Sequence, residues 1–153
     1  MTAAISLDAL VGELEILGED MYGFVNRRTG ELYGSTSEYV HKARESDDEE
    51  LLGWEVEMVE KLREILESGD WLELPARTTP EDYKIMERFC LECCEGRVQE
   101  DLLSAIGGRG AFGRFKDGIH RWGVHEAWYQ FRRRALADYA AAWLEAQGIA
   151  YGP

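Results

Sequence analysis

Residues 105–122 read Ala-Ile-Gly-Gly-Arg-Gly-Ala-Phe-Gly-Arg-Phe-Lys-Asp-Gly-Ile-His-Arg-Trp. The glycines at 107 and 108 end one helical pattern, and a second helical pattern starts within a few residues. The second pattern repeats four apolar residues at helical spacing: Phe112, Phe115, Ile119 and Trp122. We therefore expect two packed helices joined by a glycine-rich turn, with these four side chains in the core.

The same periodicity indicates further helices on both sides of this stretch. Apolar residues recur every three or four positions over 6–17, 52–66, 80–95, 98–106 and 124–146. The last of these is the longest and carries a stripe of seven residues: Val124, Trp128, Phe131, Ala135, Tyr139, Ala142 and Ala146. We expect this stripe to pack against Phe112, Phe115 and Trp122.

Strand signals are confined to the first half of the chain. Residues 21–26 and 31–34 flank Arg27-Arg28-Thr29-Gly30, where a glycine suits the left-handed position of a hairpin loop. Residues 71–74 supply a candidate third strand, and the polar stretch 35–48 predicts a loop with at most one helical turn. The pattern indicates a β-hairpin with a possible third strand beside it.

The length and amino-acid composition of the chain are those of one globular domain. A chain of 153 residues with 45% hydrophobic and 31% charged residues is long enough to bury a substantial core. We predict a single α+β domain over residues 1–153, mostly helical with five or six helices and a small two- or three-stranded antiparallel sheet.

Charge is distributed unevenly along the chain. The formal net charge is −13, which argues against a general binder of nucleic acid or membrane surfaces. Residues 105–134, however, contain seven cations and two anions and so carry +5, which leaves −18 for the remainder. The sequence predicts an acidic body with one basic segment.

The sequence shows no sign of membrane insertion or export. No apolar run approaches the roughly 20 residues of a membrane span, and the first residues lack the basic region of a signal peptide. Three cysteines, an odd number, do not make a disulfide framework. We therefore predict a cytoplasmic protein.

Two motifs in the chain resemble cofactor sites. Residues 108–113 match Gly-x-Gly-x-x-Gly, but a helix precedes them where a dinucleotide fold requires a strand, and no Gly-Lys-Ser/Thr follows. Cys90 and Cys93 have the spacing of zinc ligands, but no second pair accompanies them. We predict buried core cysteines, no metal and no cofactor.

The glycines and cations together suggest an anion site. Backbone N–H groups at a helix start favour negative charge, and glycines leave them accessible. The candidate residues are Gly108, Arg109, Gly110, Arg114, Lys116 and Arg121. Alternatively, these cations form a solvated face or pair with the protein's own acids, since Asp117 lies within one turn of several of them.

His120 is the best candidate for acid/base catalysis, because a histidine near a carboxylate such as Asp117 can titrate near neutral pH. No serine or cysteine lies at a recognisable distance from a base. Whether the protein is an enzyme is left open by the sequence.

A set of residues spread over the chain resembles a known bacterial family, uncharacterised protein family 0158. The matching residues are Pro75, Tyr83-x-Ile85-Met86-Glu87, Ala105-Ile106-x-Gly108-Arg109-Gly110-Ala111-Phe112-x-Arg114-Phe115-Lys116-Asp117-x-Ile119-His120, Trp128-Tyr129-x-Phe131 and Gly148-Ile149. Gly113 and Gly118 depart from the pattern of this family, which usually has arginine at the first of these positions and a better helix former at the second. The resemblance implies a bacterial cytoplasmic protein without an assigned activity.

Three functional hypotheses follow from these patterns, the last of them a purely structural or self-associating protein. The first is a non-enzymatic binding or adaptor protein whose basic, glycine-started helix meets an anionic partner: a phosphorylated ligand, nucleic acid or an acidic protein surface. The second is a small enzyme acting on a phosphate-containing or acyl substrate, with His120 and Asp117 as the acid/base pair. The sequence indicates neither a particular ligand nor an oligomeric state.

Overall fold

The computed structural model describes residues 4–17, 20–45, 51–75 and 79–153. The chain forms two compact units, unit 1 with residues 1–76 and 139–153 and unit 2 with residues 77–138. The described residues contain seven helices, one three-stranded antiparallel sheet and one two-stranded parallel sheet. The predicted α+β class is confirmed, with more helices than the five or six expected. That the chain is a single domain stays a prediction.

The antiparallel sheet of unit 1 has the order β3-β2-β4. Its strands are β2 (Met21–Asn26), β3 (Leu32–Thr36) and β4 (Trp71–Glu73). In the register, Phe24 pairs with Tyr33 on one side and with Glu73 on the other. Both the predicted hairpin and its third strand are confirmed.

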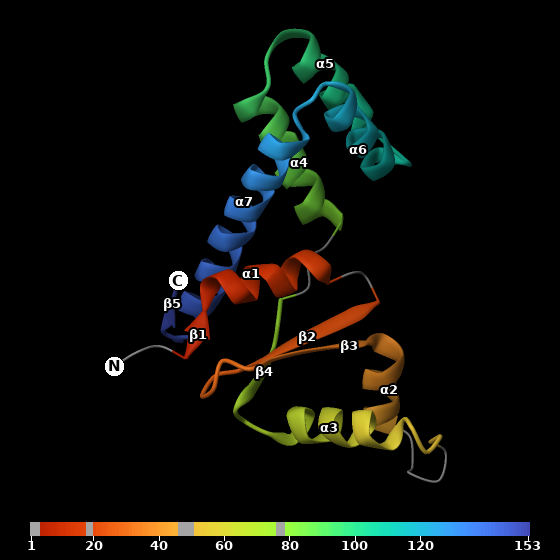
Figure 1. Cartoon of the computed structure of the whole chain (residues 1–153), viewed down its shortest axis with the longest axis vertical. Helices are drawn as coiled ribbons and strands as arrows, with labels where there is room; N and C mark the ends of the chain where they lie inside the picture. The colour runs from red at the N-terminus through yellow and green to blue at the C-terminus, as the bar shows by residue number, and fades with distance from the viewer. Residues whose placement is uncertain (1–3, 18–19, 46–50, 76–78) are drawn as a thin grey trace. The chain divides into compact units, whose positions relative to one another are not determined.

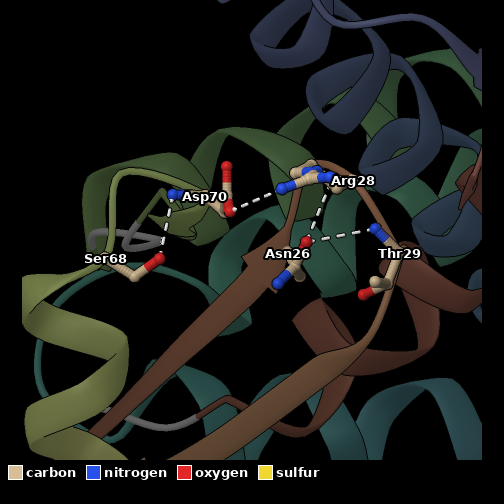
Figure 2. Close-up of polar contacts among 5 residues, drawn as sticks. All are labelled: Asn26, Arg28, Thr29, Ser68 and Asp70. Atoms are coloured by element: carbon tan, nitrogen blue, oxygen red, sulfur yellow. Dashed lines mark hydrogen bonds and ion pairs between the residues drawn. The ribbon is translucent and has the colours of Figure 1, made fainter.

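Side chains at the hairpin turn explain why the chain reverses there. The Asn26 side-chain oxygen accepts hydrogen bonds from the backbone N–H of Arg28 at 2.9 Å and of Thr29 at 3.1 Å. Asparagine commonly holds turns in this way. Arg28 also reaches the Asp70 carboxylate at 3.5 Å, and Ser68 accepts from the Asp70 N–H (Figure 2). The turn of β2 and β3 is thereby tied to the turn before β4.

Helices α2 (Ser37–Glu45) and α3 (Val56–Glu67) pack together against the sheet (Figure 1). They bury one apolar cluster with it: Phe24, Val40, Ala43, Val59, Leu62, Ile65 and Trp71. Buried Glu55, just before α3, pairs with Lys42 of α2 and accepts from the Leu52 N–H at 3.2 Å. This contact lowers the pKa of Glu55 and raises that of Lys42.

Helix α2 corrects the prediction of a loop over 35–48. Only Val40 and Ala43 are buried along it, so its sequence has too few apolar residues to show helical periodicity. Its polar face is stabilised by contacts within and beyond the helix, including His41 with Glu45 at 2.9 Å and Lys42 with Glu38 at 3.4 Å. Tertiary packing and ion pairs therefore form this helix.

Helix α1 (Leu7–Ile16) covers the other face of the sheet (Figure 1). Ser6 caps it by accepting from the Ala9 N–H at 3.2 Å, as its position before the apolar pattern predicts. Gly23 and Gly34 face each other in the hairpin, and an added Cβ would lie 2.8 Å from Leu74 or from Glu13. The paired glycines let α1 and Leu74 approach the strands closely.

A two-stranded parallel sheet joins distant parts of unit 1. Strand β1 (Ile5–Ser6) pairs with β5 (Tyr151–Gly152), with Ile5 opposite Tyr151. The Tyr151 hydroxyl donates to Glu145 at 2.9 Å, and this contact raises the pKa of Tyr151. Residues 151 and 152 thus form a strand beside the one that precedes α1.

Unit 2 is helical. It contains α4 (Thr79–Cys93), α5 (Gly96–Ala105), α6 (Ala111–Arg121) and the first part of α7 (His125–Ala146). Phe89 lies at the centre, edge-on to Phe115, Trp128 and Phe131 with ring centroids 5.4–6.2 Å apart. Full burial of such a side chain contributes about 1.5–3 kcal/mol.

The structure corrects two of the predicted stripes. On α6, Phe115 and Ile119 are buried as expected, but Phe112 is 48% exposed and Trp122 39% exposed, while Ala111 and Gly118 complete the buried face. Spacing alone cannot tell the centre of an apolar stripe from its edge.

The stripe of α7 is right only in its first half. Trp128, Phe131 and Ala135 are buried, but Leu136, Ala140 and Leu144 continue the buried face in place of the predicted Tyr139, Ala142 and Ala146. Alanines surround this part of the helix on all sides, so the apolar pattern did not single out one face.

Candidate anion-binding site

The loop between α5 and α6 is shaped by glycines. Gly108 and Gly110 have φ values of 78° and 75°, in the left-handed region that side chains other than glycine rarely adopt. Gly110 is also the residue before the first turn of α6 and provides no side-chain cap. The helical hydrogen bonds begin with the Arg114 N–H to the Gly110 carbonyl at 3.1 Å. The N–H groups of residues 111–113 consequently have no acceptor within the helix.

Arg114 holds the end of α5. Its guanidinium donates to the carbonyls of Ala105 at 3.0 Å, Gly107 at 2.6 Å and Arg109 at 2.5 Å. A Cβ at Gly110 would lie 3.0 Å from Arg114 Nη1, so glycine leaves the space this side chain occupies. Arg114 thus fixes the loop while keeping its positive charge at the loop surface.

Arg121 contacts an acid of the protein itself. Its guanidinium lies 2.5 Å from the Asp101 carboxylate of α5, which also accepts from the Trp122 indole N–H at 2.7 Å. These two donors, Trp122 first and then Arg121, lower the pKa of Asp101. The indole contact accounts for the partly exposed position of Trp122.

Arg109, Arg114 and Arg121 line one surface depression of about 580 Å³ between α5 and α6. We call it the arginine depression; Asp101, Ser104, Ala105, Gly107 and Asp117 complete its lining. The side chain of Arg109 is exposed, and no hydrogen bond or ion pair holds it among the residues that the structure describes. Three arginines against two aspartates leave the lining a net charge of +1.

Two predicted site residues, Lys116 and His120, do not line this depression. Lys116 lines a separate apolar pocket. His120 is exposed and its ring stacks on His125, with centroids 4.6 Å apart and planes at 21°. Within the described residues, neither a hydrogen bond nor an ion pair joins His120 to Asp117. The structure therefore brings together the three arginines and Asp117, but not His120 or Lys116.

The cysteines divide between core and surface. Cys90 and Cys94 are buried as predicted, whereas Cys93 is exposed. Burial raises the pKa of Cys90 to about 12 and also raises that of Cys94. Among the described residues, no three histidine, cysteine, aspartate or glutamate side chains gather as a metal site would require. No described helix is both long enough and apolar enough to cross a membrane.

Sequence reasoning missed two features of unit 2. Asp101 is one of thirty acids, and its contact with Arg121 spans twenty residues, so no local spacing marks it. The apolar pocket beside Lys116 could not be predicted, because the helical spacing of Phe112 is that of a core residue, whereas its side chain is half exposed. A half-exposed aromatic on a helix can be recognised only once the packing of its neighbours is known.

The fold and the site define a mostly helical α+β protein with a cationic depression at a glycine-rich interhelical loop. The chain belongs to the uncharacterised protein family UPF0158, whose model matches residues 40–152. No curated protein and no solved structure matches the chain. The match covers all of α3 to α7 and so includes every residue of the depression.

Proposed function

We propose that this protein is a non-enzymatic binding protein of the cytoplasm that takes an anionic group in the arginine depression. The observation that carries the proposal is the convergence of Arg109, Arg114 and Arg121 on one hollow. These cations come from the loop, the first turn of α6 and its last residue. The three free cysteines fit a reducing compartment.

Arg114 gives the depression a fixed cation. Three of its five N–H donors bind carbonyls, which leaves one N–H on each terminal nitrogen. Because these contacts already hold the side chain, an anion would bind without the entropic cost of ordering it. The positive end of the α6 dipole, at the N-terminus of the helix, also favours a negatively charged group at this position.

Arg109 is the residue that would close on the anion, since it is exposed and held by no other described side chain. Asp101 offsets part of the charge of Arg121. The small net charge of the lining favours a single phosphate or carboxylate group at the end of a partner over a long polyanion.

The test is a titration with inorganic phosphate, followed through the backbone amide signals of residues 107–114 by NMR. Arg109→Ala should weaken binding by about tenfold, the effect of losing one charge-assisted hydrogen bond. Arg134→Ala is the matched control, because it removes the same charge from an exposed position on α7. Salt should weaken binding to the wild type.

Two outcomes would contradict the proposal. One is the absence of amide shifts at the loop. The other is an equal loss of affinity in Arg109→Ala and Arg134→Ala, which would indicate attraction to the basic segment in general.

The alternative function, a small enzyme with His120 and Asp117 as acid and base, is not supported by any hydrogen bond or ion pair between these two described residues. His120→Ala should leave phosphate binding unchanged.

A further inference from the structure

Unit 2 contains a second hollow on another side of α6. It has a volume of about 290 Å³ and lies among α4, α6 and α7. Its lining shares no residue with the arginine depression. Buried side chains form its floor, namely Met86, Phe115, Ile119 and Trp128. We call it the apolar pocket.

Two aromatic side chains at the pocket are only half covered. Phe112 of α6 and Tyr129 of α7 are each 48% exposed, although both line the pocket. Leaving aromatic surface in water forgoes the stabilisation that burial gives, and such apolar surface beside a hollow is typical of a binding site. The pocket therefore offers apolar contacts both at its floor and at its rim.

The charged residues of the lining are positive on balance. The lining contains two cations, Lys116 and Arg132, and one carboxylate, that of Asp82. Lys116 is exposed, and within the described part of the chain no hydrogen bond or ion pair engages it. An ammonium beside an aromatic hollow is suited to bind an anionic group attached to an apolar body.

We propose that the apolar pocket binds a small amphipathic acid, with an aromatic or branched alkyl body against Phe112 and Tyr129 and its carboxylate on Lys116. The volume is at the lower end of the range for small-molecule sites, roughly 300 Å³. A volume of this size suits a single ring or branched alkyl group with its attached acid. This ligand class is independent of the anion proposed for the arginine depression.

The experiment is a titration with phenylacetate, compared with its neutral analogue phenylacetamide, observed through side-chain methyl signals in NMR spectra. Ile85, Met86 and Ile119 line the pocket and should shift, whereas Ile65 lies in the core of unit 1 and should not. Phenylacetate should bind about tenfold more tightly than the amide, because only the acid forms a charge-assisted contact with Lys116.

Variants separate the role of Lys116 from general charge effects. Lys116→Ala should reduce the affinity for phenylacetate to that for the amide. Lys84→Ala removes an exposed lysine of α4 outside the pocket and should leave both affinities unchanged. Phe112→Ala should weaken both ligands without loss of the fold, since this side chain is half exposed, and should not alter phosphate binding at the arginine depression.

Three results would overturn the proposal. The first is the absence of shifts at the pocket methyl groups. The second is an equal effect of Lys116→Ala and Lys84→Ala. The third is a concentration dependence of the pocket signals without ligand, which would show that a second copy of the chain occupies the site.

Discussion

The Asp101 carboxylate accepts a hydrogen bond of 2.7 Å from the Trp122 indole N–H, and this bond links α5 to the residue that follows α6. Arg121 contacts the same carboxylate at 2.5 Å. Both donors favour the ionised form and hold the pKa of Asp101 below its ordinary value of 3.8. The contact therefore stabilises the fold more strongly when Asp101 is charged than when it is protonated.

The stability of the protein should depend on this carboxylate at acid pH. Because the pKa of Asp101 is lower in the folded than in the unfolded chain, its contribution is present above the unfolded value and is lost as the pH falls through the folded one. Asp101→Asn should be less stable than the wild type at neutral pH, and the difference should shrink below the ordinary aspartate range. Urea unfolding at several pH values measures both effects. Asp138→Asn, at an exposed position of α7, serves as the control and should show no such trend.

Arg114 should matter for stability more than an exposed arginine usually does. Arg114→Ala leaves the carbonyls of Ala105, Gly107 and Arg109 without their donor, and we expect a loss of about 1–2 kcal/mol. Arg114→Lys should restore only part of it, since one ammonium cannot span three carbonyls. Denaturant unfolding with Arg134→Ala as reference gives the comparison. An Arg114→Ala protein as stable as that reference would show that the cap contributes nothing.

Two glycines within α6 should respond in opposite ways to alanine. A Cβ at Gly113 meets no atom within 4 Å, so Gly113→Ala should stabilise the protein by about 0.5–1 kcal/mol through helix propensity. A Cβ at Gly118 would lie 2.7 Å from Leu102 Cδ2, and Leu102 is fully buried. Overpacking there costs about 1–3 kcal/mol, so Gly118→Ala should be less stable than the wild type. Thermal unfolding of the two variants tests the pair, and equal gains would mean that α5 yields freely.

Thiol reactivity should distinguish the three cysteines. Cys93 is exposed, whereas Cys90 is buried with its pKa raised to about 12 and Cys94 is buried as well. The native protein should therefore react rapidly with Ellman's reagent at Cys93 alone, and the denatured protein at all three. Cys93→Ser should abolish the rapid phase. A rapid phase that survives this substitution would place a second thiol at the surface.

The prediction of a single domain can be tested through the cooperativity of unfolding. Helix α7 begins in unit 2 and ends in unit 1 without a break, so we expect the two units to unfold together. Hydrogen exchange of the buried residues Val25 in β2 and Ile119 in α6 should then give the same free energy of opening. Two different values would assign the units to separate domains.

The elements that could be predicted from the sequence are those whose residues carry a clear apolar periodicity or turn motif within a short stretch. The hairpin around Gly30 and the helix expected within residues 6–17 depend on contacts within a few residues, and both are confirmed. Helix α2 was missed because it buries only Val40 and Ala43 and depends on packing against α3.

The candidate site divides in the same way. The glycines and arginines of the loop stand together in the sequence and could be selected before the structure was known. The contact of Arg121 with Asp101 and the exposure of Phe112 could not be predicted from the sequence, because both depend on how α5, α6 and α7 pack. Tertiary packing therefore determines which of the predicted cations are paired with an acid of the protein and which are exposed to a ligand.

The pairing of β1 with β5 has a consequence for biosynthesis. Ile5 is translated before all of unit 2 but acquires its strand partner Tyr151 only after residues 151 and 152 have been translated. Residues 77–138 of unit 2 are contiguous and can assemble while translation continues, whereas unit 1 waits for its last strand. Strand β1 therefore stays without its strand partner until the end of α7 has been translated, although the three-stranded sheet of unit 1 is already complete by residue 73.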